Sequence, residues 1–545
     1  MKAGAAIAGY SRRAGLDPAI VGIVAFFLVH MLIRLFGTSN FSVDDTESAV
    51  HVQVFQLYYS LRNPPLFDWL FYGLIQVAGL SVFTIQILKT ALMAGAAILF
   101  YLALRPGFRH RAALHAGLAS YGATAFYGWD IFQQFSHTVT LIFAMAFTLW
   151  ALMRVVRAER TIDYVLLGLG LGLGLLSKYL FALFFLALLI SALRRPAYRP
   201  AILSARIGLT LIAGLIVVAP LLVGLWEARD ALFGTLGGRV GGAESGPDLE
   251  SFGFLILLTA EFWLPFAVIL WIALAKWPAS APAMDAAATA PAGERDENLY
   301  PFLRDATAIM VAAMFASFLF LGTEIEGGRY LVVMFSLLPA TVFAAIDRWP
   351  GFPQTAMERF FQGAMYFVVV IAVFRFATFL FLSPPFCIPR CVLFVDYAPV
   401  AAKIGTPDGK QNVILTNHVH IGSNLLRLVP NARVVMDAYT SGSDLGIAAP
   451  AGRNCYFVWF RNYRSATELP LERALRQALR RAPLPSELAA IGPIESVTVD
   501  WQTKVLPAYG PETVAGIARI DSAERICDGG RIAGLSPPPT NNTKQ

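Results

Sequence analysis

The run AIVGIVAFFLVHMLIRL, residues 19–35, decides the fold, because it is long and apolar enough to cross a bilayer as one helix. Arg12 and Arg13 precede it and no small-residue cleavage site follows, so we interpret it as an uncleaved signal anchor. Ten or so further apolar runs predict a polytopic membrane protein with about eleven spanning helices. These further runs lie near residues 80–104, 112–128, 138–153, 163–177, 179–193, 205–226, 252–275, 306–322, 330–346 and 361–383.

The composition excludes an ordinary soluble protein. Hydrophobic residues make up 57% of the 545 residues, and only 14% are charged, whereas about 25% is usual for soluble chains. The formal net charge is +7, but the basic residues stand in short groups between the apolar runs. That arrangement is typical of loops that orient membrane spans and argues against nucleic-acid binding.

The loop charges predict the orientation of the chain. If the N-terminus is cytoplasmic, the inside loops are rich in arginine, as in the group Arg105, Arg109 and Arg111. With about eleven spans, the region after Phe381 then lies outside the cytoplasm. The predicted outside loops hold few basic residues, namely Arg62, Lys178, Arg229, Arg239 and Arg329.

The sequence predicts a membrane domain, residues 1–383, an α/β domain outside the cytoplasm, residues 384–535, and a disordered tail, residues 536–545. In the second domain, short β-rich runs alternate with amphipathic helical segments, which is typical of a small α/β fold. We expect strands at residues 392–397, 412–415, 432–436 and 455–460, and a helix at 471–481.

All four cysteines lie in the last third of the chain: Cys387, Cys391, Cys455 and Cys527. In an oxidising compartment they can form disulfides, and the sequence leaves three pairings open. The close spacing of the first two favours a local bridge, with Cys455 and Cys527 as the remaining pair. A zinc site is a weaker alternative, because no second close Cys pair accompanies the first.

The first outer loop, residues 37–79, holds the densest group of acids. It contains Ser42-Val43-Asp44-Asp45-Thr46-Glu47, which places three carboxylates within four residues at the membrane surface. Charged groups beside a membrane are often functional, as a general base or a metal ligand. The alternative is structural: Ser42 and Asp45 have the spacing of a capping box at a helix N-terminus.

Two basic residues at predicted outer ends of spans are candidate phosphate ligands. Lys178 separates two short apolar runs, and Arg329 follows Gly327 and Gly328. Either side chain can bind a phosphate, or it can anchor a helix end at the membrane interface. His137, near the start of the fourth run, is more often a hydrogen-bonded interhelical residue than a catalyst.

Four motifs in one order resemble a known family. They are Asp44-Asp45, NPPLFDWL at 63–70, GLGLLSKY at 172–179 and GRYL at 328–331. The chain resembles the GT-C membrane glycosyltransferases of the protein mannosyltransferase and aminoarabinose transferase type. It is most similar to bacterial members that resemble the rhizobial lipopolysaccharide galacturonosyltransferases. The resemblance covers roughly residues 15–383, and it is looser in the C-terminal domain.

The resemblance implies an inverting transfer from a polyprenyl-phosphate sugar to an envelope acceptor such as lipid A or lipopolysaccharide core. It places the acid pair at the active site, so Asp44 is the expected base, Asp45 an assisting acid and Glu47 a weaker candidate. A base near the acceptor hydroxyl and cations near the leaving phosphate suit that chemistry. The expected substrate-binding residues are Tyr59, Arg62, Asn63, Lys178, Arg329 and Tyr330.

Two departures from the family pattern affect the expected chemistry. The usual second acid is Glu, but here it is Asp45. Before Pro64-Pro65, aminoarabinose transferases have Glu-Lys, and this chain has Arg62-Asn63 instead. The change removes a candidate metal-ligand carboxylate, so we expect no metal or other cofactor and a donor other than aminoarabinose.

Two other classes of function fit the sequence less well. A transporter or flippase for a lipid-linked sugar would carry charged or broken helices near the bilayer midplane and inverted repeats. The acids lie in outer loops instead, which favours an enzyme. An anchored sensor built on the C-terminal domain would leave those acids without a role.

Overall fold

The computed structural model describes residues 17–60, 63–132, 135–227, 229, 249–275, 295–321, 328–381, 393–405, 408–440, 444–462, 468–500 and 513–528. The chain forms two compact units that do not follow the chain order. The first contains residues 1–30, 89–227 and 236–373, and the second contains residues 31–88, 228–235 and 374–545. The first outer loop therefore shares a unit with the C-terminal region, on both sides of the boundary expected near residue 383.

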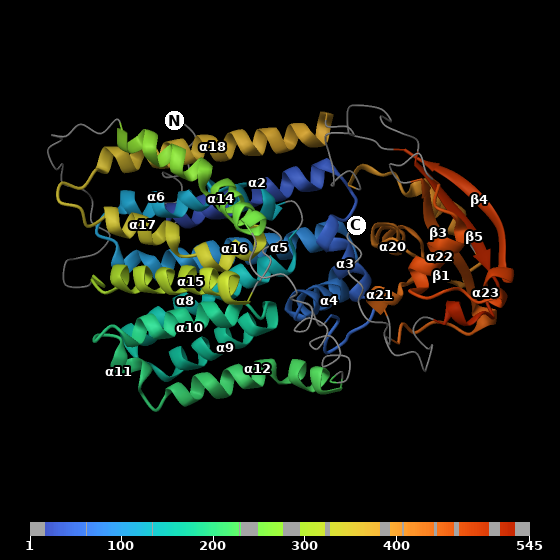
Figure 1. The fold of residues 1–545 in the computed structure, drawn as a ribbon, viewed down its shortest axis with the longest axis horizontal. Coiled ribbons are helices and arrows are strands. Elements are labelled where there is room, and N and C mark those ends of the chain that lie inside the picture. Colours follow the sequence, from blue (N-terminus) through green and yellow to red (C-terminus); the bar gives the residue numbers. More distant parts are fainter. Residues whose placement is uncertain are drawn as a thin grey trace. The chain divides into compact units, whose positions relative to one another are not determined.

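The first unit is built from apolar helices (Figure 1). Among the described residues, seven helices are long and apolar enough to cross a membrane, and four more apolar helices are shorter. The helices that correspond to the expected spans are α2 (Pro18–Gly37), α5 (Val82–Leu104), α6 (Arg111–Gly122), α7 (Ala125–Gly128), α8 (His137–Ala158), α9 (Thr161–Ser177), α10 (Phe181–Leu193), α12 (Ile207–Glu227), α14 (Leu249–Ala275), α15 (Leu299–Leu321), α16 (Gly328–Phe335), α17 (Leu338–Ile346) and α18 (Gln354–Phe381).

The expected multi-helix membrane architecture is confirmed, and every expected span coincides with helix. Two of the expected spans are broken. The run 112–128 divides into α6 and α7, and the run 330–346 divides into α16 and α17. The number of helices that cross the bilayer completely stays a prediction.

The glycine-rich motif of α9 has a packing role. A Cβ atom on Gly168 would lie 2.4 Å from the carbonyl oxygen of Thr210, and one on Gly172 would lie 2.5 Å from the Cβ of Val217. Both neighbours belong to α12, so glycine is needed for the close approach of these two helices. Small residues serve the same purpose in many membrane helix pairs.

Several arginines of the basic loops pair with buried acids of the same unit. Asp163 is fully buried and bonds Arg154 at 2.6 Å, and Asp305 pairs with Arg195. The carboxylate of Asp347, also buried, contacts His110 Nδ1 at 2.9 Å and accepts from two backbone N–H groups. These pairs leave few uncompensated buried charges, which the apolar surroundings would make costly.

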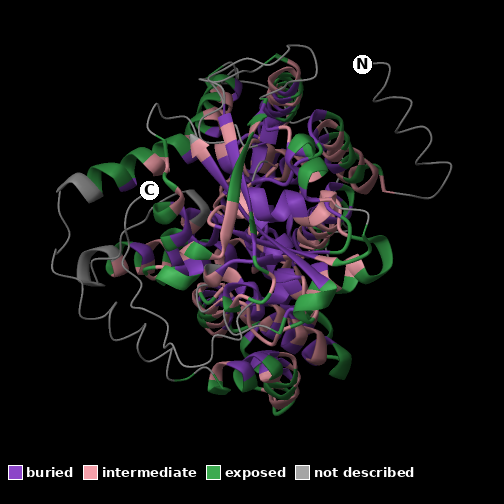
Figure 2. Ribbon diagram, turned by 90° about the vertical axis from the view of Figure 1, so that its right-hand side faces the viewer, coloured by how far each residue is buried: buried purple, intermediate pink, exposed green. Residues whose placement is uncertain are grey.

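The C-terminal part of the second unit is a five-stranded mixed sheet of order β2-β1-β3-β5-β4. Strand β1 is parallel to β2 and β3, whereas β5 is antiparallel to β3 and β4. Figure 2 shows buried residues along the central strands. The strands are β1 (Gln411–Thr416), β2 (Ala432–Val435), β3 (Arg453–Asn462), β4 (Ile491–Val499) and β5 (Thr513–Ile520), and the helices are α19 (Ala398–Ile404), α20 (Val419–Leu428), α21 (Asp437–Thr440), α22 (Leu471–Leu479) and α23 (Pro485–Ala489).

Both faces of the sheet are covered. Along β1, Ile414 packs in the cluster that includes α20, while Val413 and Leu415 pack with α22. A strand buried on both faces has a continuous apolar sequence, and this explains the short apolar run 412–415. Three of the four expected strands and the expected helix near 471–481 are confirmed, within their ends.

The expected strand at 392–397 is wrong for the residues that the structure describes. Leu393 and Phe394 form a 3₁₀ turn, and only Val395 makes an isolated bridge before α19 begins. The carbonyl oxygens of Leu393 and Val395 accept hydrogen bonds from the side chain of Asn40. These carbonyls therefore find partners without the ladder that β-propensity favoured.

The disulfide expected between Cys455 and Cys527 is present, with 6.1 Å between the Cα atoms. It ties β3 to the segment after β5, and both cysteines are fully buried. The expected bridge between Cys387 and Cys391 and the expected tail at 536–545 lie outside the described residues.

Candidate active site

The acids of the first outer loop lie on a short helix, α3 (Val43–His51), in the second unit. A second helix, α4 (Leu66–Ala78), begins directly after Pro65, because a proline is well placed just before or at the first turn of a helix. The two prolines of the NPPLFDWL motif therefore define the start of α4. The turn between α3 and α4 includes Tyr59 and Asn63, while Arg62 lies outside the described residues.

The start of α3 is held by the C-terminal region of the chain. The side-chain amide of Asn40 donates to the carbonyl oxygens of Leu393 and Val395 at 3.1 and 2.6 Å. The backbone N–H of Phe41 donates to Asn424 Oδ1 on α20 at 3.2 Å. These contacts fix the approach to α3 through groups several hundred residues away in sequence.

The end of α3 is held in the same way. The side chain of Gln53 donates to the carbonyl oxygen of Val434 at 3.0 Å and accepts from the N–H of Val434 at 2.7 Å. Val434 lies on β2, which is an edge strand of the sheet. One side-chain amide thus pairs with this edge as a neighbouring backbone would.

The three acids of α3 have different environments. Asp45 is fully buried, accepts a hydrogen bond from the Ser42 hydroxyl at 2.5 Å and lies 3.4 Å from the amide nitrogen of Gln86. The charge of the buried Arg34 also acts on it. Asp44 and Glu47 are only partly buried. Asp45 is thus fixed by protein groups, whereas Asp44 and Glu47 remain accessible.

The capping alternative fits only in part. Ser42 occupies the N-cap of α3, but its hydroxyl makes no capping bond to the helix backbone and donates to Asp45 instead. The acids still lie in or near the first turn, where the helix dipole favours negative charge. Capping therefore accounts for the position of α3 but gives no account of why Asp44 is accessible.

A buried histidine and aspartate join α3 to α4, and the sequence analysis missed this pair. His51 Nδ1 lies 3.2 Å from Asp68 Oδ2, and both side chains are about 2% exposed or less. Burial lowers the pKa of His51, but Asp68 and, to a smaller extent, Glu47 together raise it by more, so the pKa is above its ordinary value. One feature of the sequence could have indicated this pair: His51 falls in the last turn of α3, and Asp68 falls in the first turn of α4.

Tyr59 lies over this pair. Its ring stacks on the ring of His51, with 5.2 Å between the centroids, and its hydroxyl donates to the carbonyl oxygen of Val54 at 3.1 Å. Burial raises the pKa of Tyr59 well above its ordinary range. The ring of Tyr439, on α21, lies 5.7 Å from that of His51. The second unit therefore brings Glu47 and Tyr59 to the new pair, while Asp44 and Asp45 lie at the other end of α3.

The predicted residues Lys178, Arg329 and Tyr330 belong to the first unit. Lys178 is the C-cap of α9 and is partly buried. Tyr330, also partly buried, lies in α16, and Arg329 is in the same helix, but its side chain lies outside the described residues. His137 is buried at the start of α8. Among the described residues, no three His, Cys, Asp or Glu side chains gather as a metal site.

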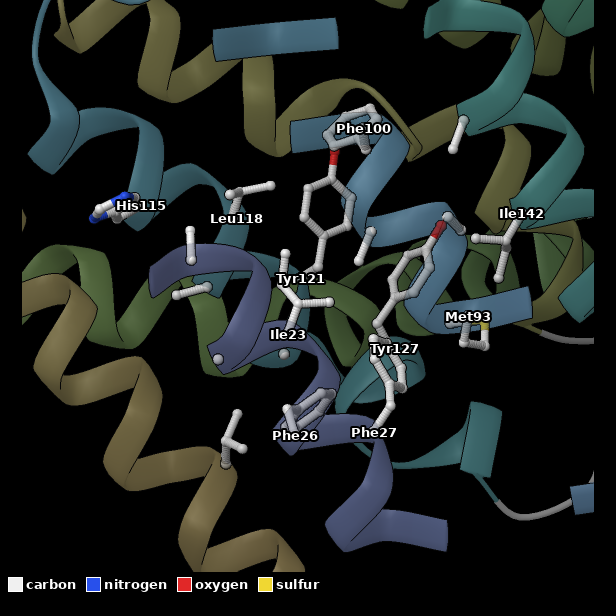
Figure 3. Close-up of a pocket in the computed structure, with 18 of the residues that line it drawn as sticks. Ile23, Phe26, Phe27, Met93, Phe100, His115, Leu118, Tyr121, Tyr127 and Ile142 are labelled. Atoms are coloured by element: carbon white, nitrogen blue, oxygen red, sulfur yellow. The ribbon is translucent and has the colours of Figure 1, made fainter. Parts of the chain in front are cut away.

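The first unit also contains an apolar cavity of about 420 Å³ (Figure 3). It is lined by α2, α5, α6, α8 and α18, with His115 at one end and Ile142 and Met93 near the other. Its Tyr121 hydroxyl donates to the carbonyl oxygen of Ser336. Because no carboxylate lines it, this cavity suits a hydrocarbon chain and not transfer chemistry.

Comparison with known proteins gives related families for part of the chain. Residues 62–224 match the family model described as dolichyl-phosphate-mannose-protein mannosyltransferase. The chain is 30% identical over 211 residues to the lipopolysaccharide core galacturonosyltransferase RgtB of Rhizobium johnstonii, and 26% identical over 198 residues to RgtA of the same organism. These matches cover 38% and 36% of this chain, and 42% and 40% of the relatives. The chain thus spans about two fifths of the length of the curated relatives it matches.

Solved structures show the fold over almost the whole chain. ArnT from Cupriavidus metallidurans bound to undecaprenyl phosphate aligns with a TM-score of 0.57 and 15% identity, over 93% of this chain and 98% of that one. The apo structure of the same ArnT aligns with a TM-score of 0.53, over 81% and 93%. The GT-C fold and the resemblance to GT-C glycosyltransferases are thereby confirmed.

Proposed function

We propose that the protein is an inverting membrane glycosyltransferase that moves a sugar from a polyprenyl-phosphate donor to a glycolipid acceptor. The similarity to RgtA and RgtB supports lipopolysaccharide core as the acceptor, and lipid A is the other acceptor that we consider. The similarity to ArnT bound to undecaprenyl phosphate supports a lipid-linked donor. The reaction takes place on the periplasmic face of a bacterial inner membrane, and no metal takes part in it.

One observation carries this proposal: α3 presents an accessible carboxylate beside a fixed one. Asp44 is partly exposed, and Asp45 next to it is fully buried and bonded to Ser42. A general base must reach the acceptor hydroxyl, which requires access. In this proposal Asp44 removes the hydroxyl proton, and Asp45 holds the helix and Arg34 in place.

The reaction then follows from the chemistry of the bonds. The acceptor oxygen attacks the anomeric carbon as its proton passes to Asp44. The bond from that carbon to the phosphate oxygen breaks, and the electron pair leaves with the polyprenyl phosphate. Attack opposite the leaving group inverts the anomeric carbon. Lys178, Arg329 and Arg62 are proposed to neutralise phosphate charge, with Tyr59, Asn63 and Tyr330 as further substrate contacts.

The test is a mass-spectrometric comparison of envelope glycolipids from cells with and without the gene. We expect a lipid A or core species to lose one sugar when the gene is deleted and to regain it on complementation. Complementation with the Asp44→Asn variant should not restore it. Identical glycolipid profiles in both strains would contradict the proposed function. If the deletion strain no longer moves the lipid-linked donor across the membrane, but its isolated membranes still transfer the sugar, the protein is a flippase instead.

A further inference from the structure

The buried pair of His51 and Asp68 lies on the same side of α3 as Asp44. Residues 44, 47 and 51 are spaced by three and four positions, so Asp44, Glu47 and His51 follow one face of the helix. His51 follows Asp44 by seven positions, and at the rise of an α-helix this separates the two by about 10 Å along the axis. This face therefore carries a carboxylate at one end and an imidazole at the other.

The carboxylate of Asp68 fixes the orientation of that imidazole. Asp68 Oδ2 lies 3.2 Å from Nδ1 of His51, and within the described part of the chain the other ring nitrogen, Nε2, makes no hydrogen bond. An aspartate that holds one ring nitrogen and leaves the other available is the arrangement by which enzymes orient an acid–base histidine. A histidine that served only to join two helices would need no available nitrogen.

The surroundings favour the charged form of His51. The titratable side chains that face it are Asp68 on α4, Glu47 on its own helix, and the phenols of Tyr59 and Tyr439. Two of these four are carboxylates, and among the described residues no cation contacts the ring. The raised pKa of His51 agrees with this arrangement of charges.

We propose that His51 is the acid of the transfer, with its Nε2–H directed at the phosphate oxygen that leaves the sugar, and that Asp68 is its positioning residue. This inference rests on the proposed function. As the bond from the anomeric carbon to oxygen breaks, the electron pair stays on the phosphate oxygen, which receives the His51 proton. The acceptor proton goes to Asp44. Solvent then takes one proton from Asp44, and His51 gains one, so charge and atoms balance.

The spacing suits an inverting displacement. Nucleophile and leaving group lie on opposite faces of the sugar ring, so the base and the acid must be well separated. In inverting glycosidases, the two carboxyl groups are about 6.5–9.5 Å apart. The rise of about 10 Å between Asp44 and His51 is of that order, and flexible side chains can shorten it.

The alternative is a purely structural ion pair that joins α3 to α4. The chain offers a control, because the partly exposed His110 and the buried Asp347 form a second pair, with 2.9 Å between Nδ1 and Oδ1, in the first unit. Both pairs hold a histidine against a buried aspartate. Only His51 lies on the helix that carries Asp44.

The experiment measures kcat of the purified full-length protein against pH, with undecaprenyl-phosphate galacturonic acid as donor and lipid A as acceptor. We expect wild-type kcat to fall at alkaline pH, above the ordinary pKa of histidine. His51→Gln should lose this alkaline limb and about 10²–10⁴-fold in kcat. Asp68→Asn should keep the limb but move it to lower pH. His110→Gln should leave the limb where it is.

Each outcome decides something. An unchanged limb in a folded Asp68→Asn protein, or normal kcat in His51→Gln, overturns the role of the pair while the proposed function stands. A limb that moves equally in His110→Gln shows a structural effect and also overturns it. A wild-type protein that transfers no sugar from any polyprenyl-phosphate donor to any lipopolysaccharide acceptor contradicts the proposed function itself. If His51→Gln does not fold, the Asp68→Asn profile still decides.

Discussion

Asp44 and Asp45 are adjacent on α3, yet the first is partly exposed and the second is fully buried against Ser42 and Gln86. The pair therefore separates into an accessible acid and a fixed one. This separation gives each acid a different expected phenotype.

The Asp44→Asn variant should fold and bind the lipid donor but lose turnover by about 10²–10⁴-fold, because it keeps shape and hydrogen bonding but removes the proton acceptor. If Asp44 only helps to cap α3, the change should cost about 1 kcal/mol or less of stability and leave most activity. Turnover and donor binding of the purified variant distinguish the two.

Asp45→Asn should lower turnover less than Asp44→Asn, with a larger loss of stability, because Asp45 is buried among fixed partners. The double variant should not add the two losses, since residues that act as a unit are non-additive. A greater kinetic loss at Asp45 than at Asp44 would exchange their roles.

Residues after about 384 should lie outside the cytoplasm, because the basic loops orient about eleven spans with the N-terminus inside. A C-terminal alkaline phosphatase fusion should therefore be active, and a GFP fusion at the same site should be dark. The reverse pattern would place the C-terminal domain and α3 on the cytoplasmic side.

Replacing Cys455 and Cys527 together by alanine should lower the free energy of unfolding by about 2–5 kcal/mol, because their bridge closes a long loop. Thermal unfolding under non-reducing conditions measures the loss, with Cys387→Ser/Cys391→Ser as the comparison. Peptide mapping of alkylated protein should also recover a Cys387–Cys391 bridge. Recovery of four free thiols would refute both disulfides.

Activity should survive EDTA, because Arg62-Asn63 replaces the Glu-Lys pair that precedes Pro-Pro in aminoarabinose transferases. The measurement is transfer by purified protein after chelation and removal of the chelator. Loss of activity followed by rescue with one divalent ion would instead mean that a metal takes part.

The C-terminal domain should lose stability as the pH falls below the ordinary pKa of histidine. Burial lowers the pKa of His418 to about 4, and burial with the nearby His418 lowers that of His420 to about 3. Both rings are neutral in the fold but take up protons on unfolding, so acid favours the unfolded state. At pH 5 each contributes a loss of about 1–2 kcal/mol. His420→Gln should flatten the dependence of the unfolding temperature on pH between 7 and 5, and an unchanged slope would contradict this.

The membrane helices could be predicted because lipid imposes a long apolar run on each of them. Strands β1 to β3 were also predictable, since a strand buried on both faces needs a short, continuous apolar sequence. Strand β4 was not, because Glu495 and its neighbours are largely exposed and give no apolar run. The segment at 393–397 misled because Asn40, far away in sequence, supplies the hydrogen bonds that a strand would have made.

The acids of the candidate site could be predicted from the sequence, but the contacts around them could not. Three acids within four residues are visible in any reading of the loop, and so is their resemblance to a family motif. The pairing of His51 with Asp68 depends on how the turn before Pro64 directs α4 back to α3, and local sequence does not encode that direction. Asp45 and Asp44 could not be ranked either, because burial is a property of the folded chain.

The contact between Gln53 and Val434 also bears on solubility. An uncovered edge strand exposes backbone N–H and carbonyl groups that can pair with another extended chain, and natural sheets protect such strands against self-association. Here the side-chain amide of Gln53, which follows α3, covers the edge strand β2 at Val434. Gln53→Ala would expose the N–H and carbonyl groups of Val434, so the change that loosens α3 would also favour self-association of the C-terminal domain.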